Sequence, residues 1–312
     1  MSIHDRCSVT IFGVDNTRWD VHGPLAGRQG VWIGEGQLSG ILDAPLESAW
    51  SETAAGIGAR HVRDRYKPRD LIVGFHVNGE GETVPGQRED ALARALVPPP
   101  YIYSPTKRTG RAEVTTEMSG MRWIYFRGQE VPEIDTGRDF LADAYANPIY
   151  NLRAGFPLWE SETIVRAFET ENTSATGEII VENPSDTPCR YTVILTPGDW
   201  LLPDPSWSGE IGEVAPGGPH ATRTIAVSVT EEHSGAVLSR NPQKLPVATP
   251  AGHNLLSAQQ GRFLVYDIPP WTPATALPIA VSNAPTGGAR AEYHLTQHWT
   301  RPWGMSRTPS GG

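Results

Sequence analysis

The sequence of 312 residues has few cysteines and no long apolar run. Its two cysteines, Cys7 and Cys189, belong to no Cys-x-x-Cys pair, so neither a disulfide framework nor a cysteine zinc site is expected. We expect both to be buried thiols. No apolar run approaches the roughly 20 residues that a transmembrane helix needs. The N-terminus places charged residues before a short apolar stretch, so we expect no signal peptide, synthesis in a cytoplasm and no membrane partner.

The chain also lacks an excess of positive charge. Its formal net charge is −9. A protein that binds nucleic acid by neutralising phosphates has the opposite balance, so nucleic-acid binding is not expected.

Sequence signatures of catalysis and cofactor binding are missing as well. There is no complete GxGxxG, no GxxxxGK[ST], no GxSxG and no HExxH. His294 and His298 have the spacing of a helical metal pair, but "AEYHLTQHW" alternates like a strand. Four residues of strand span about 13 Å, too far for one zinc ion with bonds of ~2.1 Å. We therefore expect no enzyme, no metal site and no cofactor.

Glycine and proline are abundant instead, at 32 and 28 residues, as in chains of many short strands joined by turns. In the first half, "LIVGFHV" (71–77) predicts a largely buried strand. "VPGQREDALARALVPPP" predicts one helix with Glu89 and Asp90 in its first turn, ended by prolines. "RAEVTTEM" and "MRWIYFRG" predict a hairpin that turns at Ser119-Gly120.

After residue 160 one candidate strand follows another. Seven segments, spaced as in an all-β sandwich, are "ETIVRAFE", "GEIIVEN", "CRYTVIL", "ATRTIAVSV", "GRFLVYDI", "ALPIAVSN" and "ARAEYHLTQHW". We therefore predict a mainly β protein of two domains. Residues 1–150 form a β-rich domain with one short helix, and residues 151–312 form a jelly-roll-like β-sandwich.

The stretch "LTPGDWLLPDPSWSGE" (195–210) combines carboxylates with tryptophans. Asp199, Asp204 and Glu210 beside Trp200 and Trp207 are the residue types of a sugar-binding or sugar-cleaving cleft. The prolines equally favour a rigid loop at the edge of the sandwich. In that interpretation the Trp200 side chain packs inward, together with Leu201, and the aspartates stabilise turns.

Four basic residues alternate in the first half, namely Arg63, Arg65, Lys67 and Arg69. In an extended strand all four would point to one face. Such a face is either a solvated, charge-protected edge or a contact with acidic groups of a neighbouring subunit.

Several phrases of the chain, in this order, resemble the distal tail proteins, a group of minor tail proteins, of long non-contractile-tailed phages (siphophages) that infect actinobacteria. They are "RWDVHGPLAGRQGVWIGEGQLSGILDAP", "LRAGFPLWESE", "VENPSDTPCRYTVILTPGDWLLPDPSW", "FLVYDIPPWT" and "HWTRPWG". They span nearly the whole chain, and none is a catalytic signature.

The resemblance implies a structural protein of the virion, at the tip of the tail. Its N-terminal domain would form a ring, usually a hexamer, and dock on the tail tube, while a galectin-like C-terminal domain faces outward. The ring would join the tube to the tail hub or baseplate around the end of the tape-measure protein, with no nucleic-acid contact beyond the passage of DNA.

Two alternatives remain open at this stage. In the first, the sandwich binds carbohydrate of the host envelope through Trp200, Trp207 and Asp204. In the second, the chain hydrolyses cell-wall sugar with Asp199 or Asp204. Burial of both tryptophans would argue against the first alternative.

Overall fold

The computed structural model describes residues 6–52, 56–79, 85–98, 109–134 and 145–306. The chain divides into two compact units. Unit 1 comprises residues 1–160 with residues 300–304, and unit 2 comprises residues 161–299 with residues 305–312. The division therefore lies between residues 160 and 161, ten residues beyond the boundary expected after residue 150.

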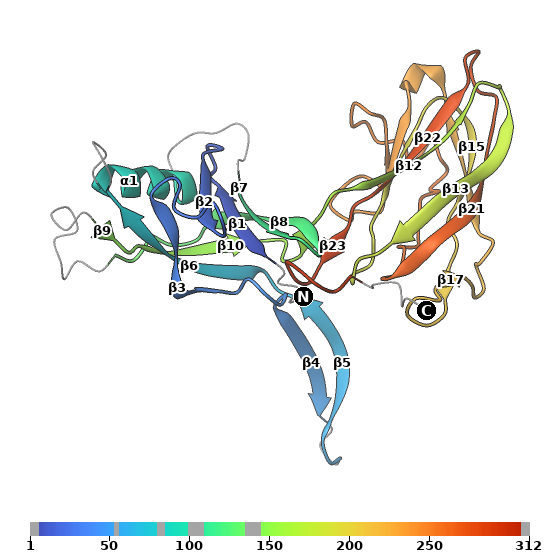
Figure 1. Cartoon of the computed structure of the whole chain (residues 1–312). Helices are drawn as coiled ribbons and strands as arrows, with labels where there is room; N and C mark the ends of the chain where they lie inside the picture. The colour runs from blue at the N-terminus through green and yellow to red at the C-terminus, as the bar shows by residue number, and fades with distance from the viewer. Residues whose placement is uncertain (1–5, 53–55, 80–84, 99–108, 135–144, 307–312) are drawn as a thin grey trace, which may run out of the picture. The chain divides into compact units, whose positions relative to one another are not determined.

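Unit 1 is built on one antiparallel sheet with the strand order β2-β1-β7-β8-β10-β6-β3 (Figure 1). The strands along this path are β1 (Cys7–Phe12), β2 (Arg18–His22), β3 (Val31–Ser39), β6 (Arg69–Asn78), β7 (Gly110–Thr116), β8 (Gly120–Gly128) and β10 (Ile149–Ala154). Short strands also add to it: β9 (Tyr145–Ala146) pairs with β6, and β11 (Trp159–Glu160) pairs with β8. The predicted strand 71–77 and the predicted hairpin are both confirmed, but the turn is formed by residues 117–119, and Gly120 already belongs to β8.

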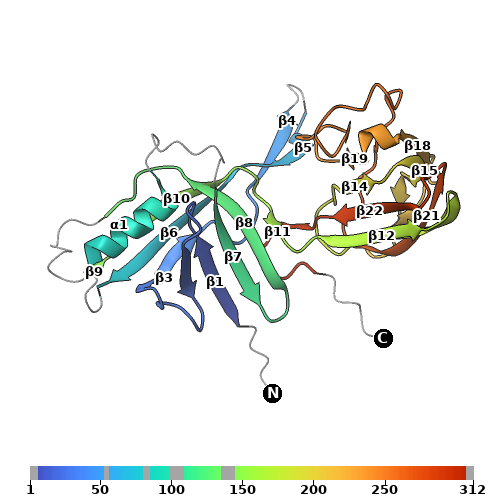
Figure 2. The same ribbon diagram turned by 90° about the horizontal axis from the view of Figure 1, so that it is seen from above.

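The predicted helix is also confirmed, as α1 (Pro85–Leu96). It lies against β6 and β9 (Figure 2) and buries Leu92, Ala95 and Leu96 completely. The expectation that Glu89 and Asp90 lie in its first turn is wrong, because the helix already begins at Pro85. Proline is favoured at the first helical position, since its missing N–H has no partner there anyway.

A two-stranded hairpin projects from unit 1 (Figure 1). It consists of β4 (Leu46–Glu52) and β5 (Ala59–Tyr66), which pair only with each other in the described part of the chain. All described side chains of β5 are exposed. We call this hairpin the arm.

Unit 2 is a sandwich of two antiparallel sheets, ordered β12-β22-β14-β19-β20 and β13-β21-β15-β18. The strands are β12 (Ile164–Thr170), β13 (Ala175–Asn183), β14 (Thr192–Leu195), β15 (Gly198–Pro203), β18 (Thr224–Val229), β19 (Ala236–Ser239), β20 (Val247–Ala248), β21 (Thr272–Ser282) and β22 (Ala289–Leu295). Outside the two sheets lie the small pair β16 (Trp207–Ser208) and β17 (Ala215–Pro216), the 3-10 turn η1 (Glu231–His233) and β23 (His298–Trp299). Alternate residues of both sheets fill one apolar core between them.

One predicted strand is wrong. "GRFLVYDI" (261–268) is irregular and contributes only a single bridge, between Ile268 and Cys189. Its main-chain N–H groups at Val265 and Tyr266 bond to the carboxylate of Asp204 instead of to a neighbouring strand. A side chain here takes the place of a β-ladder.

The predicted fold class is confirmed: the chain is mainly β, with one α-helix among its described residues and a β-sandwich in unit 2. No helix in the described ranges combines the length and the apolar character needed to cross a membrane.

Candidate interaction surfaces

The arm carries two of the four predicted interface cations, Arg63 and Arg65, and a third, Lys67, directly follows β5. Arg63, Arg65 and Lys67 are exposed. Lys67 Nζ lies 2.6 Å from Glu47 Oε1, and Arg65 contacts the other oxygen of the same carboxylate. Hydrogen bonds from Lys67 and Arg65 lower the pKa of Glu47. Arg63 lies opposite Ala49 and makes no ion pair within the described residues, so the surface keeps a positive excess.

The strand register gives the arm two unlike faces. Residues paired across an antiparallel ladder share a face, and alternate residues share it too. One face therefore holds the cations opposite Glu47, Ala49 and Ser51.

The second face of the arm is largely apolar and aromatic, although Ser48 and Asp64 also lie on it. It exposes Leu46 (58%), Trp50 (60%) and Tyr66 (46%). The Trp50 ring meets the His61 ring edge-on at 5.2 Å, and His61 in turn contacts Asp64. This face was not predicted from the sequence, because in "LESAWSE" the polar Ser48 separates Leu46 and Trp50 on the same side of the strand.

Arg69 does not belong to the basic face, and the expectation that it does is wrong. Pro68 follows the end of β5, and Arg69 begins β6 in a different sheet, so the alternation does not continue to it. The Arg69 side chain is fully buried. It donates hydrogen bonds of 2.8–3.1 Å to five main-chain oxygens, those of Gly40, Ile41, Leu42, Pro157 and Thr300.

The surroundings of Arg69 suit a buried cation that is stabilised by dipoles. Its guanidinium lies 5.8 Å from the centre of the Trp159 ring. Burial lowers its pKa to about 10, an effect that the charge of Asp43 opposes. The side chain is thus a structural link within unit 1 and is inaccessible to a neighbouring subunit.

A second buried arginine, Arg122 on β8, was not singled out from the sequence. It donates to the main-chain oxygens of Arg301 (2.9 Å) and Gly304 (2.8 Å). Together with Arg69 it binds residues 300–304 to the sheet of unit 1. Residues 300–304 of the phrase "HWTRPWG" are therefore held by arginines more than 170 positions earlier in the chain.

The carbohydrate candidates in the stretch 195–210 are only partly accessible. Trp200 is 2% exposed, donates its indole N–H to Thr196 O at 2.9 Å and meets Phe168 edge-on at 6.2 Å. It packs inward as predicted, and its ring cannot stack on a sugar. Trp207 is half-buried against the same core. Leu201, expected to pack inward, is 43% exposed, because it alternates with Trp200 on β15.

Asp204 is fully buried and belongs to the framework. Its carboxylate accepts hydrogen bonds from the N–H groups of Val265 and Tyr266 at about 3.0 Å and from Arg223 Nε at 2.8 Å. Asp204 was expected to stabilise a local turn, but its carboxylate stabilises a segment 61 positions later in the chain.

Asp199 is held between strands, not in a turn. It accepts hydrogen bonds from Ser228 and from Asn283 Nδ2 (2.7 Å), and these bonds lower its pKa. A sugar-cleaving general acid needs the opposite shift. Of the two hydrolase candidates, Asp199 is therefore unsuited to the general-acid role, and Asp204 is buried.

The histidines and cysteines also have ordinary surroundings. His294 lies on β22 and contacts Glu292 at 2.9 Å, and His298 lies on β23. No group of three potential metal ligands occurs among the described residues. Cys189 is buried, which raises its pKa to about 12, and Cys7 is half-buried; neither is in a disulfide.

Comparison by sequence finds no relative: no family model and no curated protein matches the chain. Comparison by structure finds similar proteins. The crystal structure of the SPP1 Dit protein (gp 19.1) aligns with a TM-score of 0.56 at 13% identity, covering 92% of this chain and 98% of that one. The chain has the fold of SPP1 Dit. That protein is described as a paradigm of the hub adsorption apparatus in phages that infect Gram-positive bacteria.

Two structures of the phage P2 baseplate in its activated conformation, with Ca and with Sr, align more weakly. Each has a TM-score of 0.49 at 10% identity and covers 95% of this chain and 98% of that one. The likeness to Dit covers 92% of this chain and so extends over both of its units.

Proposed function

We propose that the chain is a distal tail protein that forms a ring, a hexamer, at the tail tip of a siphophage of actinobacteria. Unit 1 forms the ring and docks on the tail tube, and unit 2 faces outward. The ring joins the tube to the tail hub around the end of the tape-measure protein. Support comes from the Dit fold over 92% of the chain and from the family phrases in the sequence.

The observation that carries the proposal is the arm. An isolated two-stranded hairpin is marginally stable in water. This one additionally exposes Leu46, Trp50 and Tyr66 on one face. Adjacent exposed aromatic and aliphatic side chains are typical of protein interfaces. A neighbouring subunit that covers this face would stabilise the arm and close it into an assembly.

A cyclic ring uses two different surfaces of each subunit, so its interface is heterologous. Arg63 has no acidic partner among the described residues, and two cations, Arg65 and Lys67, share the single carboxylate of Glu47. This face of the arm therefore has a net positive charge. Since the whole chain has a net charge of −9, acidic partners on the next subunit are plentiful. Charge complementarity of this kind fixes the register of an interface.

The experiment is charge reversal on the arm. The variant Arg63→Glu, Arg65→Glu, Lys67→Glu should remain folded and lose assembly, as measured by light scattering. Arg262→Glu, which alters an exposed arginine of unit 2, is the control and should assemble normally. Normal assembly of the triple variant would rule out the arm as the ring contact.

The carbohydrate-binding alternative now lacks Trp200 and Asp204, which are buried. Only the half-buried Trp207 remains of its three candidates.

A further inference from the structure

Unit 2 has a pocket of about 310 Å³ beside the end of β19. Arg190 lines it from the residues before β14, Arg240 and Lys244 from the loop after β19, and Phe263 and Asp267 from the irregular segment before β21. Its volume is at the lower end of the range of small-molecule sites, ~300–1,000 Å³.

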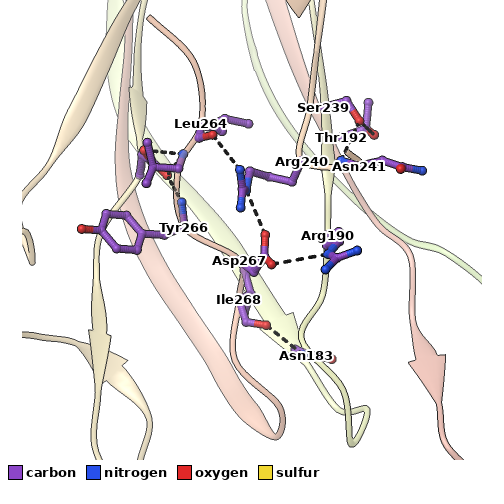
Figure 3. A network of polar contacts seen from close by, with 12 residues as sticks. Asn183, Arg190, Thr192, Ser239, Arg240, Asn241, Leu264, Tyr266, Asp267 and Ile268 are labelled. Atoms are coloured by element: carbon purple, nitrogen blue, oxygen red, sulfur yellow. Dashed lines mark hydrogen bonds and ion pairs between the residues drawn. The ribbon is translucent and has the colours of Figure 1, made fainter. Parts of the chain in front are cut away.

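The charges of this pocket do not balance. Asp267 lies between two arginines: its Oδ1 accepts a hydrogen bond from Arg240 Nε at 2.9 Å, and its Oδ2 lies 3.6 Å from Arg190 Nε (Figure 3). Lys244 adds a third cation to the lining. One carboxylate against three cations leaves an excess of two positive charges in a chain that is strongly acidic overall.

Arg240 is held in place while part of its guanidinium stays unused. Its Nη1 donates to Leu264 O at 3.0 Å, and its side chain is 22% exposed. Within the described residues, no hydrogen bond from its Nη2 is formed. Arg69 in unit 1 differs, because all three nitrogens of its guanidinium donate hydrogen bonds to main-chain oxygens. Fixed guanidinium donors beside further cations are suited to a phosphate or carboxylate oxygen.

An apolar wall lies beside these cations. The Phe263 side chain is 39% exposed, and Pro242 and Pro246 line the same pocket. The segment that carries Phe263 is fixed, because Leu264 is buried and the N–H of Val265 bonds to Asp204. The backbone that carries the ring is therefore held in place, which lowers part of the entropic cost of binding.

We propose that this pocket binds an anionic saccharide, with its phosphate or carboxylate on Arg190, Arg240 and Lys244 and a sugar face against Phe263. The proposal goes beyond the structural role and does not depend on ring formation. An acidic peptide fits less well, since peptides bind in extended grooves or along strand edges, whereas this site is a local pocket with one aromatic wall.

The test is calorimetric titration of the full chain with five probes: glucose 6-phosphate, glucuronate, glucose, inorganic phosphate and an oligoglutamate peptide. At least one of the two charged sugars should bind, more tightly than inorganic phosphate, and binding should weaken with salt because charges are screened. Glucose should not bind. If neither charged sugar binds, or if inorganic phosphate binds equally well, the proposal is wrong. Equal binding of an oligoglutamate peptide would assign the pocket to a protein partner instead.

Variants locate the binding site. Arg190→Gln and Lys244→Gln should each weaken binding about ten-fold, the effect of losing one charge-assisted hydrogen bond. Phe263→Ala should remove the preference for charged sugars over inorganic phosphate. Arg262→Gln, a nearby exposed arginine that lines a different pocket, is the matched control and should change nothing. An equal loss in the control would show general surface charge and overturn the proposal.

These outcomes are separable from those of the ring. The replaced side chains belong to unit 2 and not to the arm, so their oligomeric mass should equal that of the wild type. A chain that never assembles can still bind the sugar, and a ring can form without it.

Discussion

The guanidinium of Arg69 donates a hydrogen bond of 2.9 Å to the main-chain oxygen of Thr300, 231 positions later in the sequence. Replacing Arg69 by Met should leave several buried carbonyl groups without a hydrogen-bond donor. We expect it to lower the free energy of unfolding by about 3–5 kcal/mol. Urea denaturation measures the change. Arg63→Met, an exposed arginine of the arm, is the control and should leave the stability of the isolated chain unchanged. Equal stability of the two variants would contradict the structural role of Arg69.

Asp204 should behave as a framework residue. Asp204→Asn replaces one acceptor oxygen by a donor that faces the N–H groups of Val265 and Tyr266, and it removes the ion pair with Arg223. We expect a loss of about 2–4 kcal/mol in the free energy of unfolding. Asp199→Asn, on the exposed side of β15, should have little effect. If Asp204→Asn left the free energy of unfolding unchanged, the segment 263–268 would have to be held by other contacts.

Glu89 should make stability depend on pH. Burial raises its pKa, an effect that the hydrogen bond from Tyr150 opposes. A carboxyl with a raised pKa binds more protons in the folded state than in the unfolded state. Its contribution to stability is therefore lost as pH rises through the folded pKa.

The variant Glu89→Gln isolates this effect. Denaturant midpoints measured between about pH 4 and pH 7 should show the variant gaining stability relative to the wild type as pH rises. Parallel curves for the two proteins would show that Glu89 titrates as it does in the unfolded chain.

The apolar face of the arm should matter for assembly and not for folding. Trp50→Ser removes an aromatic side chain that is 60% exposed in the single chain. Cross-linking should then yield few oligomers, while far-ultraviolet circular dichroism stays as in the wild type. Ile211→Ser, at 62% exposure in unit 2, is the matched control and should cross-link normally. Unchanged cross-linking of Trp50→Ser would exclude this face from the interface.

Local pattern was enough to predict the elements whose partners are close in sequence. The β7–β8 hairpin, the strand 71–77 and α1 follow from alternation, turn residues and prolines. The sandwich followed from the number and spacing of its strands.

Elements that depend on remote side chains could not be predicted in this way. "GRFLVYDI" alternates like a strand, yet its N–H groups are satisfied by Asp204. Arg69 continues the two-residue spacing of Arg63, Arg65 and Lys67. Its side chain is nevertheless buried among carbonyl oxygens, two of them from residues 157 and 300. The pocket of Arg190, Arg240 and Lys244 joins segments that no spacing rule connects.

Light scattering of the purified full-length chain tests the central claim most directly. A hexameric ring predicts a molar mass six times the 34.0 kDa of one chain, with a sixfold-symmetric outline in electron micrographs. A mass that stays at that of the single chain at all concentrations, with the arm folded, would contradict the ring.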